Sequence, residues 1–347
     1  MPNILFRFYA PNNTEPMTLL NTVEAEVSLP RMLVAALTVG RPSWAAWLQH
    51  GGYSTMECTW RAAMIMANVA VSERDDGTRA FEASQAFRHL DPSEEGAATF
   101  FIAGAMTKIV AELFGVPALY HLDTLHHYSS FIGPTLPQVA MLVNATRRPD
   151  FIGPNAGMRY GVFESKGRTH HSNDPLRVSA KEQTAMINTI NGLDPICRIA
   201  CITSFGNRQM TVDVVDPTDY HKDAFSMKTE NADLKEPFRL TQQLFHENVT
   251  HEKIVQHSKF KMVKLEAADL EFGLRQDIYE TLEFGSNTDM EAQLKKRGRK
   301  ESIVYPDSLI SRLSVVEDGK EAVASDGHFV RVGPSWERWM RSTDAQS

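Results

Sequence analysis

The sequence predicts an α/β protein in which a central mixed sheet is flanked by helices. Runs of aromatic and β-branched residues at 160–163 and 196–205 are typical of buried strands. A long apolar segment that starts after Asp91 is typical of a helix packed against a sheet. The chain has 347 residues, 42% hydrophobic and 23% charged, which suits an ordinary globular protein of one or a few domains.

Residues 1–90 are predicted to form an N-terminal region that is mostly helical after a strand-like start at 1–9. Ser54 and Glu57 have the spacing of a capping box, which predicts that a helix begins just before Trp60. The charged segment 72–78 ends in Asp-Gly-Thr and is predicted to be a loop.

The clearest helix signal opens the predicted main domain. Asp91 suits the N-cap, Pro92 the first turn and Glu94 the third helical position. Gly115 supplies the stop signal. Small and apolar residues dominate 97–113, so this helix is predicted to be buried against the sheet.

The rest of the main domain, which we place at 91–216, is predicted as alternating strands and helices. A weaker helical segment at 119–128 precedes a strand from about Val143 to Asp150, and a turn at 153–157 leads into the strand at 160–163. The further predicted elements are a loop at 167–175, a helix at 179–190 and strands at 196–205 and 209–215.

The C-terminal region, 217–347, is predicted to be a helical accessory region that ends in a β-hairpin. Its helical segments are 240–245 and 267–283, and its strands are 313–316, 321–323 and 328–332. The basic run at 295–300 could contact nucleic-acid phosphates or be a solvated loop.

Three charged residues around the predicted hairpin form the candidate site. Asp150 starts one apolar segment, and Glu164 and Lys166 end the next. Because side chains alternate along a strand, Glu164 and Lys166 point to one side and Ser165 to the other. Two carboxylates and a lysine on one patch can hold a divalent cation and activate water against a phosphodiester. The alternative is a same-face surface ion pair, which stabilises a protein by about 0 to 1 kcal/mol.

This arrangement resembles the PD-(D/E)XK superfamily of restriction-endonuclease-like nucleases, whose catalytic core has the element order strand, strand, helix, strand, strand. The resemblance covers about residues 91–216. It implies a restriction-endonuclease-like core in which Asp150 and Glu164 bind Mg²⁺ or Mn²⁺, and Lys166 orients or deprotonates the attacking water. It also implies cleavage of nucleic acid, DNA more than RNA, in restriction, repair or anti-phage defence.

Further site residues follow from the same resemblance. Many relatives add a glutamate from the preceding helix, for which Glu112 is the first choice and Glu95 the second. Gln183 matches a functional glutamine of several branches, although Ile187 stands where the best-known version has tyrosine. Lys181 matches no motif itself but belongs to the same predicted helix, which is expected to pack near the site.

Arg168, His170 and His171 follow Lys166 in a loop where cationic groups could hold phosphates, or could simply be solvated. His126 and His127 are adjacent, so their side chains point apart, and we treat them as surface or structural residues. A hydrolase that uses His121, Asp123 and His126 lacks a nucleophile motif or metal spacing.

Charge and cysteine content constrain the setting. The formal net charge of −7 gives no general basic footprint for nucleic acid, so binding would use a local patch. Three cysteines favour a reduced, cytoplasmic location, and Cys197 and Cys201 are expected to be buried apolar filler rather than a metal pair. Apolar runs are too short to span a bilayer, so no membrane association is expected. A protein partner or homo-oligomer is expected, and a non-catalytic nuclease-fold subunit is the alternative function.

Overall fold

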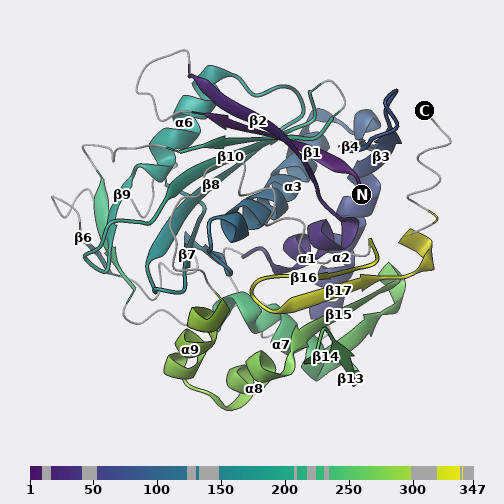
Figure 1. Cartoon of the computed structure of the whole chain (residues 1–347), viewed down its shortest axis with the longest axis vertical. Helices are drawn as coiled ribbons and strands as arrows, with labels where there is room; N and C mark the ends of the chain where they lie inside the picture. Colours follow the sequence, from purple (N-terminus) through teal and green to yellow (C-terminus); the bar gives the residue numbers. More distant parts are fainter. Residues whose placement is uncertain are drawn as a thin grey trace.

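The computed structural model describes residues 1–9, 17–40, 53–122, 130–132, 148–206, 209–216, 224–229, 234–297, 319–336 and 338. Figure 1 shows a large curled sheet that holds helix α3 (Pro92–Leu113) on one side, and a smaller sheet built from the C-terminal part of the chain. The fold is therefore mixed α/β with helices flanking a mixed sheet, as the sequence predicts.

The main sheet has the strand order β3-β4-β1-β11-β10-β8-β7-β5, and β2 also pairs with β1. It is mixed, because β8 is parallel to β10 and β1 is parallel to β11, while β10 and β11 are antiparallel. Its strands are β1 (Asn3–Tyr9), β2 (Leu19–Glu26), β3 (Val69–Glu73), β4 (Arg79–Ala83), β5 (Tyr120–His121), β7 (Phe151–Pro154), β8 (Tyr160–Arg168), β10 (Arg198–Ser204) and β11 (Thr211–Val215).

The prediction that the first 90 residues form a mostly helical addition is wrong. They contribute α1 (Leu29–Thr38) and α2 (Tyr53–Asn68), but also β1 to β4, which continue the main sheet past β11. The capping box predicted for α2 is wrong, because Ser54 lies inside the helix and its hydroxyl bonds Glu247. Glu57 accepts a hydrogen bond from Arg61 at 2.5 Å instead of capping the helix.

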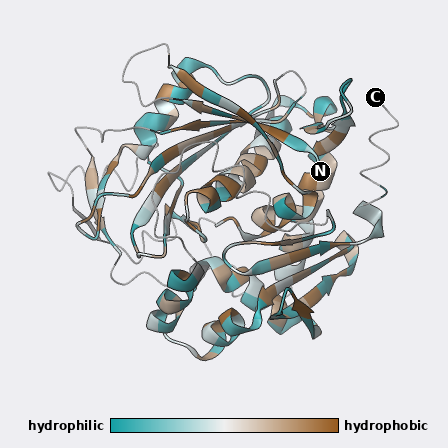
Figure 2. Cartoon of the chain, in the orientation of Figure 1, coloured by the Kyte–Doolittle hydropathy of each residue, from teal (hydrophilic) through white to brown (hydrophobic). Residues whose placement is uncertain are grey.

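Both predicted ends of helix α3 are confirmed. Asp91 accepts backbone hydrogen bonds from Ser93 and Glu94, at 2.7 and 3.1 Å, and Glu94 returns a bond to the Asp91 backbone. The chain leaves the helix through Gly115 at φ 79°. Among the described residues, α3 is the helix long and apolar enough to cross a membrane, but 78% of its apolar window is buried inside the protein, as in a core helix. Figure 2 shows hydrophobic residues along much of α3 where the helix lies beside the sheet.

The helix predicted at 179–190 lies earlier in the chain. Helix α6 spans Asp174–Thr184, with Asn173 as N-cap and Pro175 in its first turn. Asn173 and Pro175 are as typical of a helix start as of a loop, so the predicted loop at 167–175 ends earlier than expected. Residues Ile187–Ile190 instead form β9, which pairs with β12 (Phe225–Lys228), and β12 pairs with β6 (Ser130–Ile132).

The structure describes residues 119–122 of the segment predicted as a helix at 119–128. In this part, Tyr120 and His121 form the short strand β5, which pairs with β7. Asp123, His126 and His127 lie outside the described residues, as does the predicted strand at 143–147. The strands predicted at 196–205 and 209–215 are confirmed as β10 and β11.

The C-terminal region contains helices, among them α7 at the predicted 240–245, but also a five-stranded sheet with the order β13-β14-β15-β17-β16 that the sequence did not predict. The helix predicted at 267–283 is half wrong, since Leu270–Arg275 is strand β15 and only Gln276–Phe284 is helix, α8. The hairpin β16–β17 is confirmed, whereas 298–300 and 313–316 lie outside the described residues. The other elements are η1 (Phe87–His89), η3 (Glu236–Phe238), α7 (Arg239–Glu247), β13 (Thr250–Val255), β14 (Ser258–Leu265), η4 (Glu266–Ala268), α9 (Asn287–Arg297), β16 (Glu321–Val323) and β17 (His328–Val332).

Candidate active site

The β7–β8 hairpin brings the two candidate acids together. Phe151 pairs with Phe163, so the next residues outward, Asp150 and Glu164, face each other at the open end of the hairpin. The Asp150 backbone N–H donates to Glu164 Oε2 at 3.0 Å. In return, Asp150 Oδ2 accepts the Ser165 backbone N–H at 3.0 Å. The two carboxyl groups are therefore held side by side by backbone hydrogen bonds.

The turn that sets this register is built by Asn155, as the Gly-Pro-Asn signal predicts. Its side-chain oxygen accepts the backbone N–H groups of Gly157 and Arg159, at 2.9 and 3.0 Å. Met158 adopts φ 55°, which closes the turn. Since a slip of one residue would move Glu164 to the other face, the turn fixes which residues meet at the site.

Lys166 completes the cluster from the same strand. Its ammonium group pairs with Glu164 Oε1, and its side chain is 30% exposed whereas that of Glu164 is fully buried. Ser165 is buried on the opposite face. The cluster thus has a buried acid, a partly buried acid and a lysine that reaches solvent.

Burial dominates the electrostatics of Glu164. The pKa of the Glu164 carboxyl is raised to about 8, first by burial and then by the Asp150 charge, while Lys166 lowers it. Perturbed carboxyl groups with specific charged neighbours are typical of functional sites, although structural ion pairs also produce them.

Helices α3 and α6 cover opposite faces of the main sheet, and the site lies on the α6 face. A Cβ atom on Gly167 would lie 2.3 Å from the Thr99 backbone, so α3 covers the side to which Gly167 and Ser165 point. Glu164 is paired in register with Ala200, which packs with Ala180 of α6. Glu164 and Lys166 therefore point away from α3.

This placement shows that Glu112 is not a third metal ligand. It lies on α3, on the other side of the sheet from Glu164, and its carboxylate pairs with Arg31 of α1. Lys108 Nζ approaches it to 3.4 Å. Its role is a buried ion pair that joins α1 to α3.

Gln183 and Lys181 both lie in the last turns of α6 and are 8% exposed. Burial raises the pKa of Asp216, the residue after β11, to about 6, and the charges of Arg198 and Lys181 lower it. Lys181 therefore lies on the side of α6 that faces Asp216 at the end of β11. For Gln183, a role in the site stays a prediction.

The residues that follow Lys166 lie at the open end of β8. Arg168 is exposed and two residues from Lys166, so it lies on the same face. His170 and His171 are also exposed, and the His171 ring packs closely over Gly206. All three are accessible to a polyanion.

A second charged cluster on this face was not found from the sequence. Buried Asp213 of β11 accepts hydrogen bonds from Arg7 Nε at 2.6 Å, from Arg177 Nε at 2.8 Å and from the Ser172 hydroxyl. Asp213 and Lys166 are both paired in register with Ile202, so two strand spacings separate them. Arg7 and Asp213 are 206 positions apart, so no local pattern could reveal the cluster.

The chemistry of the donor set suits a hard divalent cation. Asp150 and Glu164 supply carboxylate oxygens, and Mg²⁺ is commonly held by one or two carboxylates together with waters and substrate phosphate. Within the part of the chain that is described, no cluster of three or more His, Cys, Asp and Glu side chains could hold a metal. The cysteines are buried and free, as expected of apolar filler.

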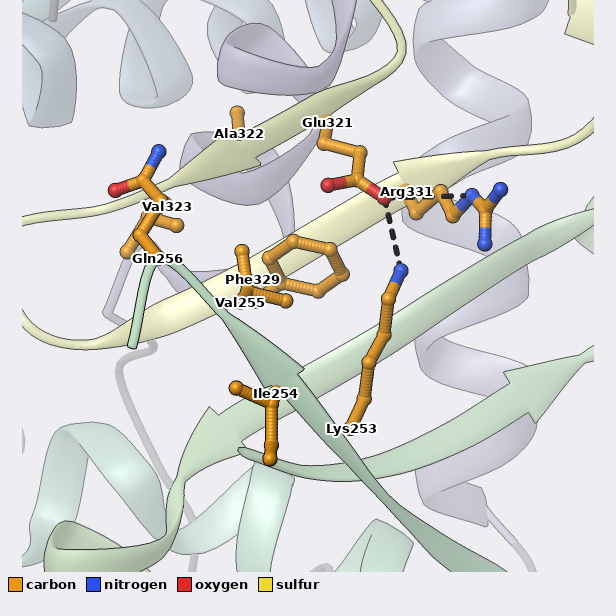
Figure 3. A pocket seen from close by; sticks show the side chains of 9 residues that line it. All are labelled: Lys253, Ile254, Val255, Gln256, Glu321, Ala322, Val323, Phe329 and Arg331. Atoms are coloured by element: carbon orange, nitrogen blue, oxygen red, sulfur yellow. Dashed lines mark hydrogen bonds and ion pairs between the residues drawn. The ribbon is translucent and has the colours of Figure 1, made fainter. Parts of the chain in front are cut away.

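A hollow of about 480 Å³ lies elsewhere, in the C-terminal sheet between β13 and the β16–β17 hairpin. Figure 3 shows Lys253 crossing it toward Glu321, with their charged atoms 2.8 Å apart, above the Phe329 ring. Lys253 and Arg331 both pair with Glu321, and Glu271 lies 3.7 Å from each of them, so two carboxylates match the two cations. It contains none of the predicted site residues.

Comparisons with family models, with curated proteins and with solved structures found no match to this chain.

Proposed function

We propose that this protein is a metal-dependent nuclease that hydrolyses phosphodiester bonds, in DNA more than in RNA. The observation that carries the proposal is the β7–β8 hairpin, which sets Asp150 opposite Glu164 with Lys166 at the same end of the strand.

The element order gives independent support. β7, β8, α6, β10 and β11 follow one another as strand, strand, helix, strand, strand, with β9 between α6 and β10 in a separate small sheet. This is the order expected from the resemblance to restriction-endonuclease-like nucleases. Helix α6 crosses over between the parallel strands β8 and β10 on the face of the site.

In the proposed mechanism, Asp150 and Glu164 would hold Mg²⁺ or Mn²⁺, which would neutralise charge on the phosphodiester and acidify water. Glu164 must be ionised for this, so its proton has to leave the buried site. Lys166 gives up its contact with Glu164 Oε1 and turns toward the reacting water or phosphate, where it orients the water or stabilises developing charge. Arg168, His170 and His171 are placed to contact flanking phosphates.

The alternative, a non-catalytic nuclease-fold subunit, is favoured by the Glu164–Lys166 pair itself. Lys166 lies against Glu164 Oε1 and lowers the pKa of this carboxyl, as it would in a purely structural ion pair. By analogy only, the proposal also includes a protein partner that targets the nuclease and a cytoplasmic location. It also includes, on the same ground, a role in anti-phage defence, restriction or repair.

A cleavage assay with matched variants tests the proposal. The full chain is incubated with plasmid, linear DNA, single-stranded DNA and RNA, with Mg²⁺, with Mn²⁺ or with excess chelator. We expect cation-dependent cleavage, reduced by on the order of 100-fold or more in Lys166→Ala and Glu164→Gln. Lys259→Ala is the control, because Lys259 is a lysine on a strand whose side chain is 52% exposed.

Undiminished cleavage in excess chelator contradicts the two-carboxylate mechanism, and wild-type cleavage by Lys166→Ala contradicts the role of the lysine. Nucleic-acid binding by fluorescence anisotropy without cleavage under any cation favours the non-catalytic subunit. Each variant is checked by circular dichroism for an unchanged fold.

A further inference from the structure

Arg7 lies in one row with Lys166 across the main sheet. Lys166 of β8 is paired in register with Ile202 of β10, which is paired with Asp213 of β11. Asp213 is in turn paired with Arg7 of β1. Side chains of residues paired in register point to the same face of a sheet. The Arg7 side chain therefore lies on the same face as the candidate site.

The loop between β8 and α6 connects these two positions along the edge of the sheet. It begins after Arg168, the last residue of β8. The ring of His171 packs over Gly206, just beyond the end of β10. The next residue, Ser172, accepts a hydrogen bond from Arg7 Nη2 of β1 at 3.2 Å. The loop therefore crosses the sheet from β8, past the end of β10, to β1.

The Arg7 guanidinium is held from one side and open on the other. Its Nε donates to Asp213 Oδ1 at 2.6 Å, and its Nη2 donates to the Ser172 hydroxyl. A guanidinium has five N–H groups, and these two are the ones that bond described residues. The Arg7 side chain is 20% exposed and its Nη1 reaches the surface. Part of a rigidly held arginine fork is therefore available to a ligand.

Asp213 does not depend on Arg7 alone for a partner. Arg177, the inner arginine, donates from Nε to Asp213 Oδ2 at 2.8 Å, and the Ser172 hydroxyl also bonds this oxygen. The inner arginine is 8% exposed and lies over the Tyr9 ring, 4.2 Å from its centroid. The buried carboxylate is thus held from inside, and Arg7 is the member of the cluster that faces out.

Carboxylates lie beneath the cations at both ends of this row. Glu164 is 0% exposed and its partner Lys166 is 30% exposed. Asp213 is 0% exposed and its partner Arg7 is 20% exposed. Asp174, which is 29% exposed, pairs with the inner arginine at 2.6 Å. In each of the first two pairs the outward group is the cation, which is the group that a phosphate would meet.

We propose that Arg7 binds a backbone phosphate of the same nucleic-acid strand that is cleaved beside Lys166. This inference rests on the proposed function. Three strand spacings separate β8 from β1, about 14 Å, which a stacked strand covers in about four nucleotides. Arg168, His170 and His171 lie along the way, so the strand follows the loop across the sheet. An arginine fork fixed in advance suits phosphate, because little side-chain freedom is lost on binding.

Fluorescence anisotropy in excess chelator, where no strand is cut, tests the proposal on the full chain. The probes are labelled single-stranded DNAs of about 12 and about three nucleotides, longer and shorter than the distance from Lys166 to Arg7. Arg7→Gln should weaken binding of the long probe about ten-fold and lower its salt slope by about 0.7, the loss of one phosphate contact. Binding of the short probe should not change. Arg7→Lys keeps the charge and should keep the slope.

Arg331→Gln is the matched control, because Arg331 is a strand arginine paired with an acid, 49% exposed, in the C-terminal sheet. Circular dichroism and urea unfolding check the fold of each variant. If Arg7→Gln alone unfolds, Arg7→Gln with Asp213→Asn removes the cation and the carboxylate together and should show the same loss of slope.

An unchanged affinity and salt slope in Arg7→Gln would show that Arg7 only anchors the loop, and would overturn the inference without touching the proposed nuclease. Equal weakening for both probes would also overturn it, because the effect would then not depend on the far end of the strand. A wild type that binds neither probe overturns the inference together with the proposed function. The expected effects in a protein that cleaves under no cation would support the phosphate site and contradict the nuclease.

Discussion

Glu164 carries a carboxyl group into the interior of the main sheet, where Asp150 and Lys166 are its charged neighbours. Burial and the Asp150 charge favour the protonated form, while Lys166 favours the carboxylate. This balance has a consequence for folding that can be measured without any substrate, because a shifted pKa is a statement about stability.

We expect the metal-free protein to lose stability as pH rises toward 8. The pKa of Glu164 is about 8 when folded and near its ordinary value of 4.5 when unfolded, so between these values the folded state binds the extra proton. The contribution is fully present below pH 4.5 and is lost as pH rises through 8. Its size is on the order of a few kcal/mol.

Urea unfolding of the wild type and of Glu164→Gln at a series of pH values measures this effect. The amide cannot ionise, so the difference between the two proteins should change steadily from pH 5 to pH 8. Glu266→Gln is the control, since the Glu266 side chain is 76% exposed. A parallel pH dependence for wild type and Glu164→Gln would show that the folded protein does not raise the pKa of Glu164.

At the scale of elements, the packing of α3 on β8 depends on Gly167. A Cβ atom there would lie 2.3 Å from the Thr99 backbone, and backbone cannot move aside as a flexible side chain can. Gly167→Ala is therefore expected to destabilise the protein by about 1 to 3 kcal/mol, the cost of overpacking.

The control substitution lies in α3 itself. Gly96→Ala adds a methyl group where no atom lies within 4 Å, so it should stabilise the protein by about 0.5 to 1 kcal/mol through helix propensity. Urea unfolding compares the two variants. Equal effects of the same sign would show that the close approach of α3 to β8 does not constrain position 167.

The elements that the sequence predicts well are those specified by neighbouring residues. Asp91 and Glu94 cap α3 because both partners lie within one turn, and Asn155 closes the β7–β8 turn for the same reason. Asp150 and Glu164 could be brought together in prediction because a single hairpin separates them. Glu112 could not be excluded, because its position depends on which face of the sheet α3 covers.

Other features depend on distant parts of the chain. β1 belongs to the main sheet because it pairs with β11, and the Asp213 cluster forms because that pairing brings Arg7 beside it. In the C-terminal region, the charged segment that includes Leu270–Arg275 becomes a strand because β14 and β17 flank it. Tertiary pairing of this kind overrides local propensity.

At the scale of the whole molecule, a buried ionic network joins the C-terminal sheet to the helix behind the candidate site. Lys108 of α3 lies 2.7 Å from Asp326 in the turn of the β16–β17 hairpin, and the two side chains are 0% and 2% exposed. Asp326 also lies 3.0 Å from His328, whose ring is stacked between Phe238 and Phe272. The C-terminal sheet is thus anchored in the same interior as the main sheet, which predicts that the two unfold together.

Lys108→Met tests this prediction. Removing one partner leaves the other charge buried, so the variant should lose about 3 to 5 kcal/mol, whereas Lys253→Met, at a partly exposed pair, should lose about 0 to 1 kcal/mol. Replacing both partners, as Lys108→Met with Asp326→Leu, should recover much of the loss, because a buried ion pair is often replaceable by apolar residues.

Lys108 also holds the pKa of Asp326 below its ordinary value, so the stability that this pair contributes is present at neutral pH and lost as pH falls. Hydrogen exchange in Lys108→Met should rise in β8 and β15 alike, and a rise confined to β15 would show that the C-terminal sheet opens independently of the main sheet.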